Sequence, residues 1–144
     1  MASNTQISAG DGWVILTGFT TNTSDLGSHF SGGIFTAPVT GIYSIGSHFM
    51  IYSVSATNYF LVKGNHVNSS NSGIQEYYVK HTEYTEGSSN SHNYYGYDSN
   101  QSLNLYMAKG DIYRYEAFAG SGNGHVGTAS VSYTHLTLPT IYSV

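Results

Sequence analysis

The amino-acid sequence predicts an all-β fold, a jelly-roll sandwich of two antiparallel sheets, from three observations. Aromatic residues make up 15% of the chain and charged residues 8%, against roughly 25% charged residues in an average soluble domain. Apolar and polar residues alternate along short segments, which is the period of a strand. Gly, Asn and Ser residues separate these segments as turn formers do, and no segment shows a helical period.

Length and charge limit the possible partners. The chain has 144 residues, which fits one domain, and 4 Lys and Arg residues against 8 Asp and Glu residues, for a net charge of −4. The basic surface that nucleic acids require is missing, and no apolar run is long enough to span a bilayer. We therefore expect no nucleic-acid partner and no membrane insertion. Residues 1–6 do not read as a signal peptide, so an export signal would lie outside this chain.

The first half of the chain contains two strand signals, of which the second is the stronger. Residues 13–16 predict a short strand, and residues 22–33 form a turn-rich stretch anchored by Phe30. The strongest alternation covers residues 41–52, which predicts a long, mostly buried strand. Its expected inward face comprises Tyr43, Ile45, Ser47, Phe49 and Ile51.

Four more strands are expected further along the chain. Residues 59–62 are apolar on both faces, which predicts a strand with two partners, and residues 63–65 then predict a turn. Residues 74–85 alternate like a strand with one solvated face. Residues 103–107 and 112–118 predict a hairpin closed by Lys109, Gly110 and Asp111.

A resemblance rests on residues 33–43, which read Gly-Ile-Phe-Thr-Ala-Pro-Val-Thr-Gly-Ile-Tyr. This segment resembles the signature of the globular head domain of complement C1q, a family within the tumour-necrosis-factor-like jelly rolls. Pro38 restricts φ between two strands, Gly41 permits a close approach or a positive φ, and Tyr43 starts the inward face. The signature residues that match are Phe30, Gly33, Phe35, Pro38, Gly41, Tyr43, Lys109, Gly110 and Asp111.

The end of the chain does not match this family. The resemblance implies a last strand after residue 130, running between the first strand and the strand at residues 59–63. Residues 131–144 instead resemble a translated sequencing adaptor. We therefore divide the chain into an N-terminal lead (residues 1–12), a C1q-like domain (residues 13–130) and an artefactual tail (residues 131–144), with the authentic last strand missing.

The resemblance implies a non-catalytic recognition head that forms a homotrimer and binds an unknown extracellular ligand. We expect a secreted protein of innate-immune type. The alternative is a head domain on a phage or virus fibre, at the virion surface. A hydrolytic enzyme is a third, weaker hypothesis. We expect a trimer interface built from the apolar residues Tyr59, Leu61, Leu103 and Leu105.

Candidate ligand-binding and metal-binding residues follow from side-chain chemistry. Tyr supplies a large area and a hydroxyl group at low entropic cost, so the candidates for ligand binding are Tyr94, Tyr95 and Tyr97. The His residues are scattered without metal-ligand spacing, and we expect no metal and no cofactor. Some heads of the family bind calcium, and calcium remains open here. The acids considered for it are Asp11, Asp25, Asp98 and Asp111.

Overall fold

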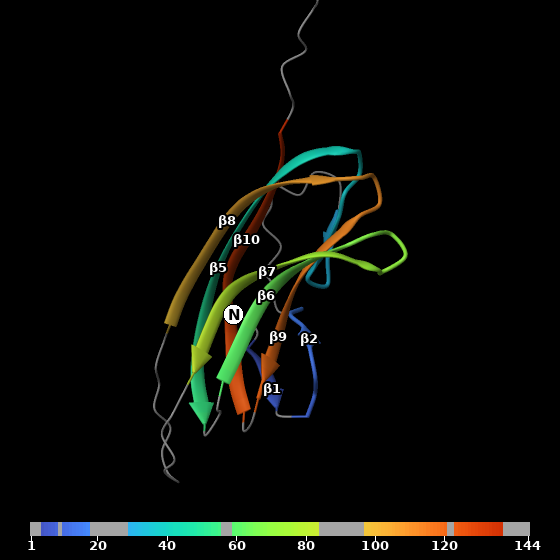
Figure 1. Cartoon of the computed structure of the whole chain (residues 1–144). Coiled ribbons are helices and arrows are strands. Elements are labelled where there is room, and N and C mark those ends of the chain that lie inside the picture. The colour runs from blue at the N-terminus through green and yellow to red at the C-terminus, as the bar shows by residue number, and fades with distance from the viewer. Residues whose placement is uncertain are drawn as a thin grey trace, which may run out of the picture.

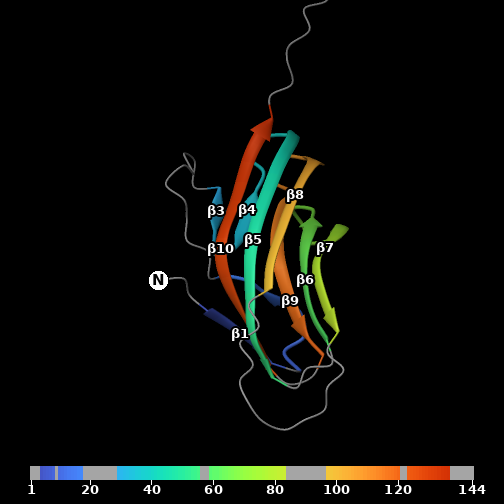
Figure 2. The same ribbon diagram turned by 90° about the vertical axis from the view of Figure 1, so that its left-hand side faces the viewer.

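The computed structural model describes residues 4–8, 10–17, 29–55, 59–83, 97–120 and 123–136. These ranges form ten β-strands in two antiparallel sheets that face each other (Figures 1 and 2). The strands are β1 (Asn4–Ser8), β2 (Val14–Ile15), β3 (Phe30–Ser31), β4 (Ile34–Thr36), β5 (Gly41–Ser55), β6 (Tyr59–Val67), β7 (Gly73–Glu83), β8 (Tyr97–Met107), β9 (Ile112–Ala119) and β10 (Asn123–Leu136). The predicted jelly-roll sandwich of two antiparallel sheets is confirmed.

The strands divide between the sheets in a non-sequential order. Sheet A has the order β1-β10-β5-β8, and sheet B has the order β3-β4-β9-β6-β7, with β2 also paired to β9. β5 and β6 are neighbours in the chain but lie in different sheets. Within the described ranges, no helix could cross a membrane.

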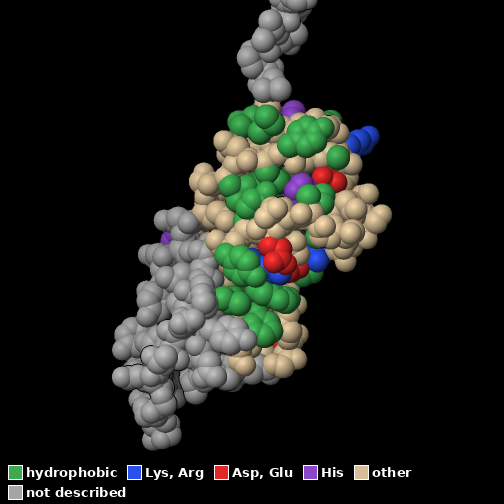
Figure 3. All heavy atoms as spheres, viewed as in Figure 1, with side chains coloured by type: hydrophobic (Ala, Val, Ile, Leu, Met, Phe, Trp, Pro, Cys, Tyr) green, Lys and Arg blue, Asp and Glu red, His purple; other side chains and the backbone are tan. Residues whose placement is uncertain are grey.

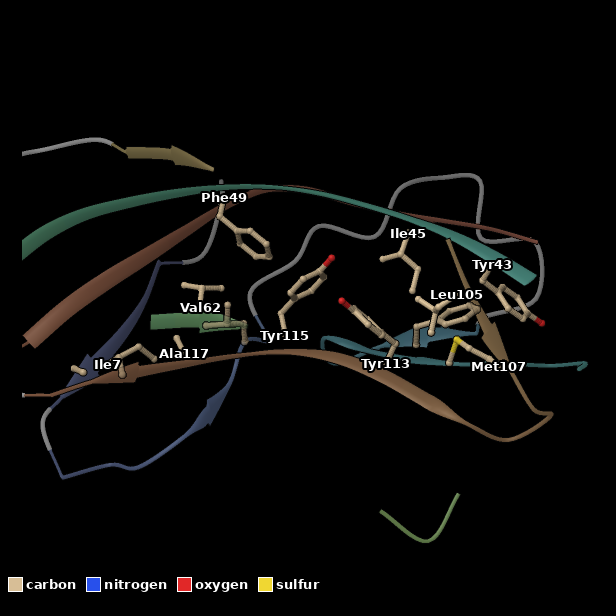
Figure 4. Close-up of a cluster of buried hydrophobic side chains, with 14 residues drawn as sticks. Ile7, Tyr43, Ile45, Phe49, Val62, Leu105, Met107, Tyr113, Tyr115 and Ala117 are labelled. Carbon is tan, nitrogen blue, oxygen red and sulfur yellow. The ribbon is translucent and has the colours of Figure 1, made fainter. Parts of the chain in front are cut away.

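The core lies between the sheets and confirms the alternation predicted for β5. Tyr43, Ile45 and Phe49 are fully buried and point from sheet A into the core (Figure 4). The ring of Phe49 lies 4.8 Å from that of Tyr115 on β9, and the ring of Tyr43 lies 5.3 Å from that of Phe35 on β4. The side chain of Ile51 lies outside the described residues. The central position predicted for residues 59–62 is also confirmed, because β6 pairs with both β7 and β9.

The predicted hairpin at residues 103–118 is wrong. β8 pairs with β5 in sheet A, whereas β9 pairs with β4 and β6 in sheet B, so the turn between β8 and β9 crosses from one sheet to the other. Gly110 makes this possible with a φ of 88°. Its N–H donates to the carbonyl of Ala37 over 2.8 Å, and the N–H of Ala37 donates to the carbonyl of Asp111 over 2.9 Å. The crossing from β4 to β5 is thereby joined to the crossing from β8 to β9.

Both ends of the sandwich differ from the expected boundaries. β1 lies within the expected lead, pairs with β10, and contributes the fully buried Ile7 to the core. β10 forms the last strand, which the sequence analysis expected to be missing. Its neighbours are β1 and β5, not β6. Its end, residues 131–136, comes from the expected tail. Backbone pairing requires only an extended chain, which Val and Thr favour, so a strand forms there.

Candidate functional site

The signature residues hold together the crossing from β4 to β5 and the crossing from β8 to β9. The hydroxyl of Tyr43 donates to the carbonyl of Val39 over 2.7 Å, and the N–H of Lys109 donates to Thr40 Oγ1 over 2.9 Å. Asp111 Oδ2 accepts from the N–H of Ala108 over 3.0 Å. The Tyr43 hydroxyl, the Asp111 carboxylate and the backbone of Lys109 therefore support the fold.

Glycine and aromatic signature residues allow close packing beside these crossings. Gly33 has a φ of 79°, and a Cβ there would collide with the carbonyl of Leu16. Of the two roles expected for Gly41, the structure supports close approach, because a Cβ there would meet the ring of His135. Phe35 is buried, and its ring stacks on that of Tyr133 with centroids 4.3 Å apart. The remaining signature residues are Phe30, whose ring lies 5.4 Å from that of Tyr133, and the half-buried Pro38.

A cluster of charged side chains lies on the outward face of sheet B, on neighbouring positions of β6 and β9. We call it the Trp13 patch, and it comprises Trp13, Lys63, Asn65, Glu76, Tyr78, Arg114, Glu116 and Phe118. Figure 3, which views the side carrying β6 and β7, shows basic and acidic side chains gathered in a small area bordered by apolar ones. Lys63 stands opposite Glu116, and Asn65 opposite Arg114, in the pairing of β6 with β9.

Glu116 is the centre of the polar contacts in the Trp13 patch. Its Oε1 accepts from Arg114 Nε over 2.7 Å, and its Oε2 lies 3.6 Å from Lys63 Nζ. Both oxygens also accept from Asn65 Nδ2 over 3.3 Å. Lys63 forms a further ion pair with Glu76. The side chains of Lys63 and Glu116 are 5% and 7% exposed, so each charge depends on its partners for stabilisation.

The Trp13 ring covers the Lys63 ammonium, and two other aromatic rings adjoin Trp13. Lys63 Nζ lies 3.8 Å from the centroid of the Trp13 ring, a cation–π contact. The ring of Phe118 lies 5.4 Å from that of Trp13, and the ring of Tyr78 lies 6.5 Å from it at an interplanar angle of 68°. Trp13 reaches this place because β2 pairs with β9 beside it.

The sequence analysis missed the Trp13 patch because it predicted a turn at residues 63–65. That prediction is wrong, since β6 continues to Val67. A continued alternation was the available signal. Leu61, Lys63, Asn65 and Val67 share one face of β6, and Ile112, Arg114, Glu116 and Phe118 lie opposite them on β9.

The outward face of sheet A contains no charged side chain among its described residues, taking His as neutral. On the edge strand β8, Ser102, Asn104 and Tyr106 are exposed, with Tyr106 at 65%. The outward positions of β5 and β10 whose side chains are described are Ile42, Ser44, Gly46, His48, Thr134 and Leu136. The side chains described on this face are thus uncharged, and that of Asp98, also on β8, is not among them.

The residues expected at a trimer interface are not brought together. Leu105 is 6% exposed and belongs to the core, and Leu103 packs against that core. Leu61 is half-buried in sheet B, on the opposite side of the sandwich. The side chain of Tyr59 lies outside the described residues. Leu103 and Leu105 therefore face this chain's own interior, because β8 is an edge strand whose alternate residues close the core.

The expected ligand-binding tyrosines precede or begin β8 in the sequence. Tyr94 and Tyr95 lie outside the described residues. Tyr97 begins β8 and pairs with Ile51, but its side chain is not among those described. The Tyr97 backbone therefore belongs to sheet A.

Two of the four acids considered for calcium stabilise turns. Asp11 Oδ2 accepts from the N–H of Ser8 over 2.8 Å. Asp111 accepts from His66 Nε2 over 2.9 Å, and both side chains are at least nine-tenths buried. Asp25 and the side chain of Asp98 lie outside the described residues. In the described part of the chain, no three His, Asp or Glu residues form a group that could hold a metal ion.

The pair of His66 and Asp111 is also the arrangement that a hydrolase would use to orient a base. No hydroxyl group hydrogen-bonds to His66 among the described residues. Asp111 belongs to the turn that joins the two sheet crossings, so the pair anchors β6 to that turn.

Buried tyrosines form a layer between the two sheets. The hydroxyls of Tyr113 and Tyr115 both donate to Gln101 Oε1, over 3.2 and 3.3 Å. Burial raises the pKa of Tyr115 to about 12. Burial, assisted by the neighbouring Tyr115, also raises the pKa of Tyr113 and of Tyr133 above the ordinary value. These hydroxyls therefore stay protonated in the folded state.

Two solved structures show the same architecture. The globular domain of zebrafish complement 1qA protein is similar with a TM-score of 0.54 and 14% identity, covering 94% of this chain and 91% of that chain. The Eiger TNF structure from S. frugiperda is similar with a TM-score of 0.60 and 10% identity, covering 98% of this chain and 90% of that chain. No protein-family model and no curated protein matches the sequence. The fold is thus that of the C1q and tumour-necrosis-factor-like jelly rolls.

Proposed function

We propose that this chain is a non-catalytic, extracellular recognition head that assembles as a homotrimer through the outward face of sheet A. The observation that carries the proposal is the absence of charge from the described side chains of that face. Burying a charge against a neighbouring copy costs desolvation energy, so an uncharged face is suited to self-association. The resemblance to C1q heads, which pack three copies around one sheet, supports three copies rather than two.

The trimer leaves the outward face of sheet B available for a ligand. If sheet A faces the other copies, the Trp13 patch on the opposite side of the sandwich remains in solvent. That side carries the exposed aromatic and acidic side chains that recognition surfaces use. Self-association and ligand binding would therefore occupy different sheets.

Sedimentation equilibrium tests this proposal. We expect the 144-residue chain to be a trimer at micromolar concentration, and the Asn104→Arg variant to be a monomer, because the substitution adds an exposed charge to β8. Gln75→Arg is the matched control, since Gln75 is exposed on β7 of sheet B, and it should remain trimeric. A monomeric unsubstituted chain, or an Asn104→Arg variant that stays trimeric, would refute the assembly.

A further inference from the structure

The Trp13 patch combines exposed aromatic rings with a fixed carboxylate, outside the sheet that the trimer uses. We propose that it binds the ring of a neutral saccharide. This inference rests on the proposed function, because it names the class of ligand that the recognition head takes. Three features support it: exposed aromatic rings, a fixed carboxylate and balanced charges.

The aromatic rings supply a surface for the C–H groups of a sugar. Trp13 is 37% exposed and Tyr78 is 57% exposed, although both are large side chains that usually bury their area. Their rings lie 6.5 Å apart at 68°, so together they form an angled apolar corner. The face of an aromatic ring carries partial negative charge and attracts the weakly positive C–H groups on one side of a pyranose.

The carboxylate of Glu76 supplies an acceptor for sugar hydroxyls beside that corner. Lys63 holds one of its oxygens in an ion pair, and the Glu76 side chain is still 46% exposed. An acceptor that is already fixed loses little conformational entropy when a hydroxyl binds to it. Hydrogen bonds to an ionised carboxylate are also stronger than neutral ones. A saccharide presents hydroxyls next to its C–H face, which matches this arrangement.

Charge balance favours a neutral ligand over a charged one. The two cations, Lys63 and Arg114, are matched by the two anions, Glu76 and Glu116. The Lys63 ammonium already lies 3.8 Å from the Trp13 centroid, so a second cation on that ring would be repelled. An anion would be repelled by the half-exposed Glu76. These two repulsions exclude charged ligands more strongly than neutral ones.

Tryptophan fluorescence tests the proposal, because Trp13 is the only Trp among the 144 residues. The full chain is titrated with short neutral oligosaccharides of glucose, galactose, mannose and N-acetylglucosamine, one at a time. We expect at least one of them to change the Trp emission in a saturable manner. Tetramethylammonium and a sulfated oligosaccharide are the charged probes and should change it less. No saturable change with any neutral probe, or tighter binding of a charged probe, would overturn the proposal.

Single substitutions test whether the saccharide binds at the Trp13 patch. Tyr78→Ala should weaken the affinity for the responding oligosaccharide by about fivefold to tenfold, and Glu76→Gln should weaken it as well. Ile74→Ala is the matched control, because Ile74 is 50% exposed on the same strand, and it should bind as the unsubstituted chain does. Equal binding by all three variants would overturn the proposal.

Sedimentation separates this inference from the proposed function. A chain that is trimeric but binds none of the neutral probes refutes the saccharide and leaves the recognition trimer intact. A chain that is monomeric but binds a probe, with the expected loss in Tyr78→Ala, refutes the trimer and leaves the saccharide site intact.

Discussion

The outward faces of the two sheets differ in the charge of their described side chains. Sheet B gathers Lys63 and Arg114, two of the 4 Lys and Arg residues in the chain, into a patch where their charges are balanced by Glu116 and Glu76. The described side chains of the outward face of sheet A carry none. A low charged fraction thus does not mean an evenly uncharged surface. Among the described residues, fixed and partly covered charges gather on the outward face of sheet B.

The largest difference between the two sheets is expected when sheet A loses the end of β10. Residues 131–136 of β10 pair with residues 42–47 of β5, and Tyr133 stacks on Phe35. Removing residues 131–144 would leave the β5 backbone along that stretch paired only with β8, with its other edge open. We expect the chain ending at residue 130 to lose cooperative thermal unfolding, measured by circular dichroism.

The control for this truncation is Thr134→Ala in the full chain. Thr134 is exposed on the same strand, so this variant should melt with the unsubstituted protein. A shortened chain that melts cooperatively at the same temperature as the full chain would contradict the role of β10. It would instead support the interpretation of residues 131–144 as an artefactual tail.

The buried charges of sheet B provide the next largest effect. Glu116→Ala removes the shared partner of Lys63 and Arg114 and leaves two cations insufficiently compensated. We expect a loss of about 3–5 kcal/mol in the free energy of unfolding, measured by urea denaturation. Glu76→Ala removes a half-exposed carboxylate from the same patch and should cost at most about 1 kcal/mol. Similar losses in both variants would show that burial does not distinguish the two ion pairs.

The tyrosine layer between the sheets predicts sensitivity to alkali. The pKa of Tyr115 is raised by burial from 10.0 to about 12, so above pH 10 the unfolded chain loses protons that the folded chain keeps. Stability should therefore be unaffected below that pH and fall as the pH rises toward 12, by about 1.4 kcal/mol for each pH unit and tyrosine.

Urea denaturation across this pH range measures the effect. Tyr113→Phe removes one buried ionisable hydroxyl and should make the decline less steep. A free energy of unfolding that stays constant up to pH 12, or an equally steep decline in Tyr113→Phe, would show that the raised pKa values do not control stability.

The local features of the strands were predictable from the sequence. The alternation over residues 41–52 correctly predicted the described inward side chains of β5, and the matching signature predicted a link between two strands at Pro38. Both depend on neighbouring residues, since the direction of each side chain in a strand follows from the one before it. The composition predicted the fold class for a similar reason, because aromatic and β-branched residues fit pleated surfaces.

The sequence by itself determined the strands and their faces, and only the tertiary structure decided which strands pair and which side chains meet. Apolar and polar residues alternate in the same way whether two consecutive strands form a hairpin or lie in opposite sheets. The pattern of residues 103–118 therefore does not show that their turn crosses between sheets. From the sequence, Leu103 and Leu105 were expected at an interface between copies. In the structure they pack in or against the core, because β8 is an edge strand of sheet A. The Trp13 patch requires Trp13, Lys63 and Glu116 to meet across three strands. Such contacts between distant residues depend on chain topology, which no local pattern encodes.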